Sequence, residues 1–220
     1  MTKTISLFIL TLFISIFSYG QEELKLYKNI YRTSDSLKLI GHIKDIDSTI
    51  FKTANKLDKQ HPLKFFETSG ELLLKAKFNE ASFIYYLGLM RFRYYNSVNP
   101  DYQPSGDGAL FGSLKYTMDE PVNMYLRTDI DNFISIIKMT IDYYGKNDFT
   151  FYTNQKDIEK FNLQTKSYLD LVTELETNKT QYSEQWDAER KTMEKNIEEL
   201  IIHYNETEKD NSKDKKKKGK

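Results

Sequence analysis

Apolar residues recur at steps of three and four along most of the chain, which is the spacing of one face of an amphipathic helix. This pattern predicts helices over residues 35–58, 62–76, 79–96, 108–118, 121–127, 130–144, 157–176 and 182–204, with a short helix or lead-in at 21–32. No convincing strand ladder is present. The sequence therefore predicts an all-α fold of roughly eight or nine helices joined mostly by short loops.

Residues 81–90, ASFIYYLGLM, differ from the other predicted helices because they carry no charge on any side. A helix that is apolar all round is either buried or forms the floor of a binding groove. The segment is too short to cross a bilayer, which takes about 20 residues. We therefore expect this helix at the centre of the domain.

The first twenty residues have the features of a secretory signal peptide. Lys3 supplies a positive start, residues 5–17 are almost wholly apolar, and Ser18 and Gly20 place small residues where a signal peptidase reads them. We expect cleavage before Gln21, export to the periplasm or the outside of the cell, and no stable membrane insertion afterwards. The alternative is an uncleaved anchor, for which the apolar run is short.

The remaining chain is predicted to form one all-α domain, residues 21–205, and a disordered basic tail, residues 206–220, which ends in KDKKKKGK. The chain has 32 Lys and Arg and 32 Asp and Glu, so it lacks the basic excess expected of a nucleic-acid-binding protein. It has no Cys and hence no disulfide framework, so the fold must be stabilised by packing.

Residues 61–93 contain two predicted helices joined by a tight turn at 77–79. Phe65 and Tyr85 supply one bulky aromatic residue in each helix, and Leu72 takes the next core position. Small residues stand where two helices would meet closely, at positions Ser69, Ala81 and Gly88. In this pattern the segment resembles a tetratricopeptide repeat, although Arg93 stands where that family often has Pro.

A fainter echo of the same repeat covers residues 117–140, with Phe133 in place of the small Ala and with Pro121 inside the first helix. The resemblance implies stacked antiparallel helical hairpins with a concave surface that binds a peptide or a protein. It implies no catalytic residue.

Residues for metal or nucleophilic chemistry are sparse. The three His residues, His42, His61 and His203, are far apart in sequence, there is no Cys, and no Gly-x-Ser-x-Gly motif occurs, so we expect no metal, no cofactor and no catalysis. Several acidic residues stand at predicted helix starts, where helix capping favours them. The alternative hypothesis is a hydrolase-type enzyme in which Asp107, Glu120 and an Arg converge near the loop at 99–120.

Tyr and Arg are the residue types that protein-binding surfaces favour. Candidate binding residues lie on the 81–95 helix, in the adjoining loop stiffened by two prolines and at the end of a later helix: Arg91, Arg93, Tyr94, Tyr95, Tyr102 and Arg127. An aromatic core with paired Arg residues would give the same composition. The sequence favours an exported, non-catalytic protein-binding or adaptor module, one version of which is an immunity-type inhibitor of a toxin.

Overall fold

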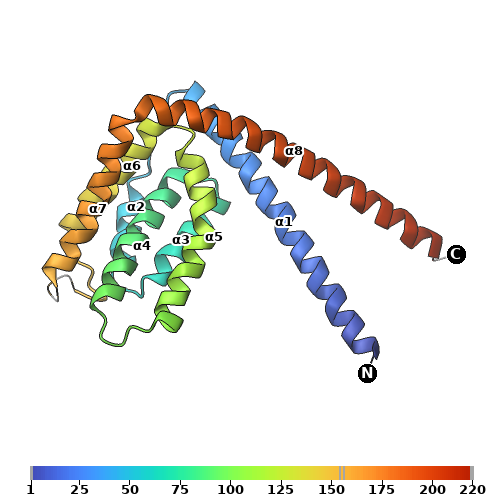
Figure 1. Cartoon of the computed structure of the whole chain (residues 1–220), viewed down its shortest axis with the longest axis horizontal. Coiled ribbons are helices and arrows are strands. Elements are labelled where there is room, and N and C mark those ends of the chain that lie inside the picture. The colour runs from blue at the N-terminus through green and yellow to red at the C-terminus, as the bar shows by residue number, and fades with distance from the viewer. Residues whose placement is uncertain (1, 154, 156, 219–220) are drawn as a thin grey trace. The chain divides into compact units, whose positions relative to one another are not determined.

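The computed structural model describes the backbone of residues 2–153, 155 and 157–218, and the side chains of residues 20, 22–153, 155 and 157–207. These residues form helices and no strands, which confirms the all-α prediction (Figure 1). The helices are α1 (Thr2–Leu39), α2 (Thr49–Leu57), α3 (Leu63–Leu74), α4 (Phe78–Val98), the short π-helical turn η1 (Pro104–Gly108), α5 (Ala109–Leu126), α6 (Ile130–Lys146), α7 (Ile158–Thr177) and α8 (Lys179–Lys218).

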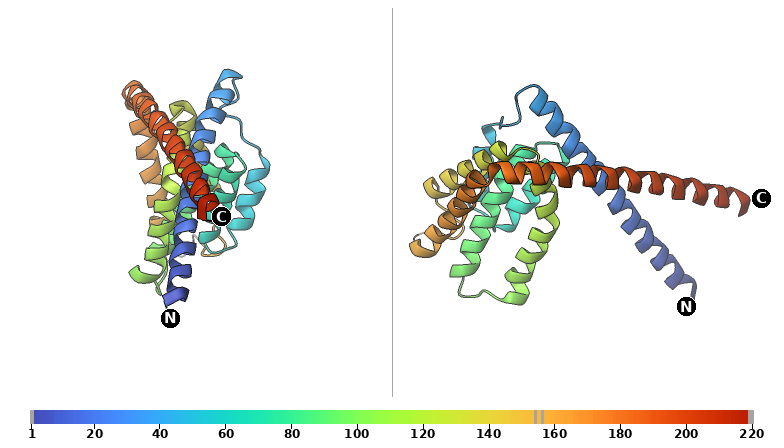
Figure 2. Two further views of the ribbon diagram at one scale, coloured as in Figure 1. Left: turned by 90° about the vertical axis from the view of Figure 1, so that its right-hand side faces the viewer. Right: turned by 45° about the horizontal axis from the view of Figure 1, so that its top comes forward.

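The chain divides into two compact units, one of residues 30–186 and one of residues 1–29 with 187–220. In the first unit α4 is the central helix, and every residue of the uncharged stretch 81–90 is buried. Helices α6 and α7 lie on one flank of α4 and α5 lies on the other (Figures 1 and 2). The central position predicted for this stretch is therefore confirmed.

Helices α3 and α4 form the most extensive helix pair of the structure. The buried Ser69 Oγ donates a hydrogen bond of 2.8 Å to the carbonyl oxygen of Ala81 on the facing helix. A Cβ added to Gly88 would lie 2.6 Å from the Cβ of Phe65, closer than such atoms approach. Small residues thus let the two helices approach closely, whereas Leu72 is only half buried.

The helix predicted over residues 35–58 is interrupted in the structure. Helix α1 ends at Leu39 and α2 begins at Thr49, and between them Gly41 has φ +76°. This left-handed conformation has no steric cost for glycine and is unfavourable for most other residues. The apolar spacing continues across the break, and for this reason periodicity alone did not reveal it.

Residue Pro121 was expected to begin a separate short helix, but α5 runs through it without a break in helical assignment. A proline inside a helix removes a backbone hydrogen bond and costs about 3 kcal/mol or more. Pro121, Val122 and Tyr125 are buried, and α5 packs on α4. The burial of this face offsets the cost of the proline.

The second unit consists of residues 1–29 and 187–220. A Cβ added to Gly20 would lie 2.9 Å from the Tyr204 hydroxyl oxygen, so α1 and α8 approach closely there. Helix α8 continues to Lys218, whereas the sequence predicted disorder from residue 206. Lys, the commonest residue of this end, is a good helix former.

The predicted signal peptide stays a prediction, because the side chains of residues 1–19 lie outside those that the structure describes. Among the described residues, none of the helices combines the length and the hydropathy that crossing a membrane requires.

Candidate functional site

On one side of α4, which we call the closed side, other segments cover Arg91 completely, so that this residue has no exposed surface. Its Nε donates a hydrogen bond of 2.8 Å to Asp58 Oδ1, and the guanidinium carbon lies 4.6 Å from the centre of the Tyr144 ring. Burial raises the pKa of the Asp58 carboxyl, outweighing the lowering effects of Arg91 and of the Tyr143 hydroxyl. Arg91 is therefore part of an internal ion pair and not of a binding surface.

Tyr94 is also fully buried, and its hydroxyl donates a hydrogen bond of 2.9 Å to the carbonyl oxygen of Thr153. Both Arg91 and Tyr94 were candidate binding residues, and the structure places both in the interior. The sequence contains no local sign of this, because the residues that enclose them come from α2, α6, α7 and the loop at 147–153.

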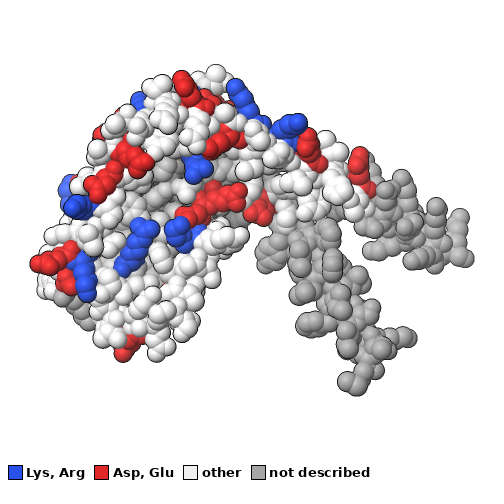
Figure 3. Space-filling view, in the orientation of Figure 1, with Lys and Arg blue, Asp and Glu red and all other residues white. Residues whose placement is uncertain are grey.

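The opposite side of α4, between α5 and α7, carries a group of polar side chains that we call the tyrosine face: Tyr85, Tyr86, Arg93, Asp119, Asn123 and Tyr168. Arg93 Nη1 donates a hydrogen bond of 3.1 Å to the Tyr168 hydroxyl, and the Tyr86 hydroxyl donates one of 2.6 Å to Asn123 Oδ1. Figure 3 looks onto this side of the bundle and shows acidic and basic side chains near its centre.

Burial keeps the tyrosine hydroxyls of this face protonated. It raises the pKa of Tyr168 to about 12 even though the Arg93 charge lowers it, and it raises the pKa values of Tyr85 and Tyr86 still further. The hydroxyls therefore act as hydrogen-bond donors at any physiological pH. Arg127 is exposed, its charge lowers the pKa of Tyr86, and its guanidinium lies 6.0 Å from the centre of the Trp186 ring.

Aromatic rings from three separate segments meet where α4 ends. We call this group the aromatic end: His61, Tyr95, Tyr102, Phe151 and Tyr152. The centre of the His61 ring lies 5.4 Å from that of Tyr95 and 5.7 Å from that of Phe151, and the Tyr95 and Tyr152 rings are 5.4 Å apart. Tyr102 is 39% exposed and Phe151 is 40% exposed. Of the predicted binding residues, Tyr95 belongs to this ring group, and Tyr102 lies in the adjoining loop with its hydroxyl against Gly108, the neighbour of Asp107.

The closed side of α4 holds part of the aromatic end in place. The backbone N–H of Phe151 donates a hydrogen bond of 2.8 Å to the Asp58 carbonyl oxygen, and the Thr150 hydroxyl donates one of 3.2 Å to the same oxygen. Arg91 Nη2 donates one of 2.8 Å to the carbonyl oxygen of Asn147. Both members of the buried ion pair therefore position the loop that presents Phe151.

His61 and Asp107 form the polar edge of the aromatic end. His61 Nδ1 accepts a hydrogen bond of 3.2 Å from the backbone N–H of Leu63, which leaves Nε2 facing Asp107 Oδ1 at 3.6 Å. Burial, followed by the charge of Asp107 and its hydrogen bond, raises the pKa of Tyr95. The carboxylate of Asp107 thus lies against both a histidine and a tyrosine.

The carboxylate arrangement that the hydrolase hypothesis requires is not present. Glu120 is exposed on α5, about 16 Å along the helix axis from Ala109 at a rise of 1.5 Å per residue. Asp107 precedes Ala109 and lies beside His61. Asp107 and Glu120 therefore do not line one pocket.

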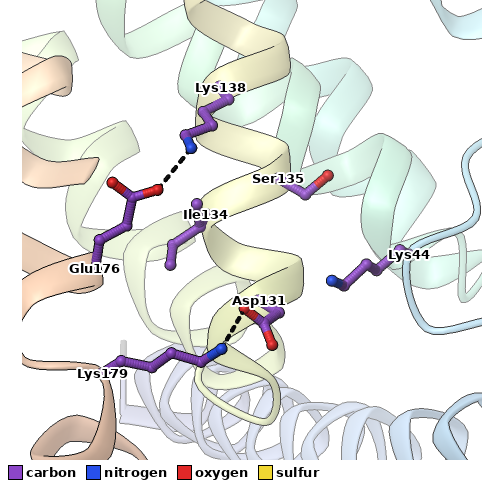
Figure 4. Close-up of a pocket in the computed structure, with 7 residues that line it drawn as sticks. All are labelled: Lys44, Asp131, Ile134, Ser135, Lys138, Glu176 and Lys179. Atoms are coloured by element: carbon purple, nitrogen blue, oxygen red, sulfur yellow. Dashed lines mark hydrogen bonds and ion pairs between the residues drawn. The ribbon is translucent and has the colours of Figure 1, made fainter. Parts of the chain in front are cut away.

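A hollow of about 410 Å³ lies beside α6 and α7 (Figure 4). Its polar lining forms ion pairs, with Lys138 Nζ 2.6 Å from Glu176 Oε1 and Lys179 Nζ 2.7 Å from Asp131 Oδ1. These side chains are about half exposed, and such pairs contribute about 0–1 kcal/mol. The hollow is lined mainly by solvated ion pairs between helices and lacks the apolar lining of a typical ligand pocket.

No group of three His, Cys, Asp or Glu side chains in the part of the chain that the structure describes is placed to hold a metal ion. Comparison with protein-family models, with curated proteins and with solved structures finds no significant match.

His61, Phe151 and Tyr152 were not predicted to be surface residues. The loop at 147–153, NDFTFYT, carries three aromatic residues in a segment with no helical periodicity, and this composition was an available signal. Aromatic residues in a loop have no helix face on which to be buried, so they must pack against another segment or remain exposed.

Proposed function

We propose that the chain is a non-catalytic protein-binding or adaptor module that contacts its partner through the aromatic end. The observation that carries this proposal is the meeting of exposed aromatic side chains from three segments at one end of the bundle. Tyr102 and Phe151 are each about two-fifths exposed, the Phe151 ring lies 5.8 Å from the partly exposed Tyr95, and Tyr102 lies in the loop that follows α4. Clustered aromatic residues of this kind are typical of the energetic centres of protein interfaces.

The hairpin of α3 and α4 supports a tetratricopeptide-like origin for this module. The contact between Ser69 and Ala81 and the close approach of Gly88 to Phe65 are the small-residue contacts that the resemblance of residues 61–93 implies. The fainter unit at 117–140 adds no such support, because α5 packs mainly on α4, α6 packs on α7 and α4, and α5 and α6 make little contact with each other.

The proposed setting is the periplasm or the outside of the cell, which follows from the signal-peptide features of residues 1–20. An immunity-type inhibitor that covers a toxin surface is one form of this function. The position of Asp107 beside His61 and of Glu120 far along α5 favours the binding module over the hydrolase alternative.

A capture experiment tests the proposal. The full chain carries a C-terminal tag in its own cells, and partners are recovered with the wild type, with Tyr102→Ala/Phe151→Ala, and with Tyr116→Ala. Tyr116 is the matched control because it is 87% exposed on α5. We expect a discrete partner that is lost with the double variant and retained with the control, at unchanged helical circular dichroism.

Retention of every partner by the folded double variant would contradict the assignment of the aromatic end. Recovery of a chain that still begins at Met1 would contradict the predicted export.

A further inference from the structure

The aromatic end has an acidic rim. Asp101 and Asp107 lie in the connection between α4 and α5, and Asp148 lies in the loop that carries Phe151. Asp107 Oδ1 lies 3.6 Å from His61 Nε2, and after burial the charges of Asp107 and, last, of Asp101 contribute to the raised pKa of Tyr95. In Figure 3 the end of the bundle formed by this connection is mostly uncharged, with acidic atoms at its tip.

Three of the described cations near these segments have partners of their own. Arg91 is buried against Asp58, and Lys64 lies 2.6 Å from Glu67. Lys160 Nζ donates a hydrogen bond of 2.8 Å to the carbonyl oxygen of Ser97. The described surroundings of the exposed rings therefore favour positive charge on a partner.

Two physical effects at this surface favour the same ligand group. The faces of aromatic rings attract Lys and Arg side chains through the ring quadrupole, most strongly where water is excluded. Carboxylates beside the rings supply charge complementarity, which selects a cationic partner and speeds its association. An acidic partner would be repelled, and a purely apolar partner would remove water from Asp101 and Asp107 without replacing it.

We propose that the aromatic end binds a Lys or Arg side chain in a basic segment of the partner protein. This inference rests on the proposed function and specifies the chemistry of the partner. Tyr102 and Phe151 provide exposed ring surface, and Asp101 and Asp107 supply negative charge in the segments that carry or adjoin these rings. The interaction weakens as salt rises, because charges at an exposed rim are screened.

The test uses a synthetic (Lys-Gly)₅ peptide as probe, the full chain as protein, and backbone amide NMR signals as readout. We expect the signals of residues 101–108 and 147–153 to shift with this peptide and to stay unchanged with (Glu-Gly)₅. Asp101→Asn/Asp107→Asn should weaken binding by about tenfold, because it removes two rim charges. Glu67→Gln/Glu71→Gln changes the net charge equally on the exposed side of α3 and should leave the affinity within about twofold.

Equal binding of the Lys peptide by both pairs of variants would overturn the inference, because the effect would then follow net charge alone. Equal binding of the Glu peptide would also overturn it. A chain that binds the Lys peptide only after deletion of residues 211–220 would place its own basic tail on this surface, which overturns the assignment to a partner.

The capture experiment separates this inference from the proposed function. If Tyr102→Ala/Phe151→Ala loses the partner while Asp101→Asn/Asp107→Asn keeps it at full strength, the binding surface stands and the cationic partner is wrong. If both variants keep the partner, the proposed surface itself is wrong. If both lose it and the Glu67→Gln/Glu71→Gln control keeps it, both proposals are supported.

Discussion

The two sides of α4 place the same residue type in opposite surroundings. Arg91 is fully buried and bonded to Asp58, whereas Arg93 is partly exposed and bonded to the neutral hydroxyl of Tyr168. A step of two residues turns a helix by about 200°, so neighbouring arginines point to opposite flanks. The comparison shows that the role of an arginine here depends on what packs against each flank, and not on its position in an aromatic-rich segment.

The Arg91 side of α4 is also connected to the aromatic end, through the loop at 147–153. Asp58 and Arg91 anchor this loop by hydrogen bonds, and the same loop presents Phe151 at the aromatic end. Arg91 is therefore expected to influence binding only by positioning Phe151. If an Arg91 variant remains folded, it should displace Phe151 and so weaken binding, although Arg91 itself does not contact the partner.

The largest expected effect separates the two arginines directly. Arg91→Ala leaves the Asp58 carboxylate buried without its cation, and loss of one partner of a buried pair costs about 3–5 kcal/mol. Arg93→Ala removes one partly buried hydrogen bond and should cost about 1 kcal/mol or less. Urea unfolding of both variants measures the difference. Similar losses of unfolding free energy in the two variants would mean that the two arginines contribute equally to stability, which would contradict the comparison.

A pair of glycines extends the comparison from charge to packing. Gly88→Ala would place a methyl group against the Cβ of Phe65, and overpacking of this kind costs about 1–3 kcal/mol. At Gly112 on α5 an added Cβ meets nothing within 4 Å, so Gly112→Ala should stabilise the protein by about 0.5–1 kcal/mol. Thermal unfolding of the two variants gives the sign of each change. A Gly88→Ala protein as stable as the wild type would show that α3 and α4 can separate at little cost.

The smallest effect concerns two carboxyl groups that titrate in opposite directions. The hydrogen bond from Lys179 lowers the pKa of the exposed Asp131, so its contribution to stability is present above the ordinary aspartate pKa and is lost as pH falls through the folded value. Burial raises the pKa of Asp58, so the free energy of unfolding decreases as pH rises from the ordinary pKa through the folded one. NMR titration of the carboxyl carbons measures both values. If the pKa values of Asp131 and Asp58 were shifted in the same direction, the contrast between the two carboxyl groups would be wrong.

Local sequence signals predicted the helical fold and several helix starts, although not the break between α1 and α2 or the continuation of α5 through Pro121. The acidic residue before the helix predicted at 130–144 is its cap: Asp129 Oδ1 accepts a hydrogen bond of 2.8 Å from the N–H of Asn132. The burial of residues 81–90 also followed from sequence, because a helix without charge on any side has no solvated face. Both features depend on residues within one or a few turns of each other, and sequence patterns report such distances well.

Tertiary structure alone decided which flank of α4 is closed. Arg91 and Asp58 are 33 residues apart in the chain, and Tyr143, Asn147 and Phe149 complete the enclosure from α6 and the following loop. The aromatic end likewise forms only because two segments that are distant in sequence, those of His61 and Phe151, meet beside Tyr95. Periodicity identifies the face of a helix that is apolar but does not identify the segment that covers it, and these contacts depend on how separate helices pack together.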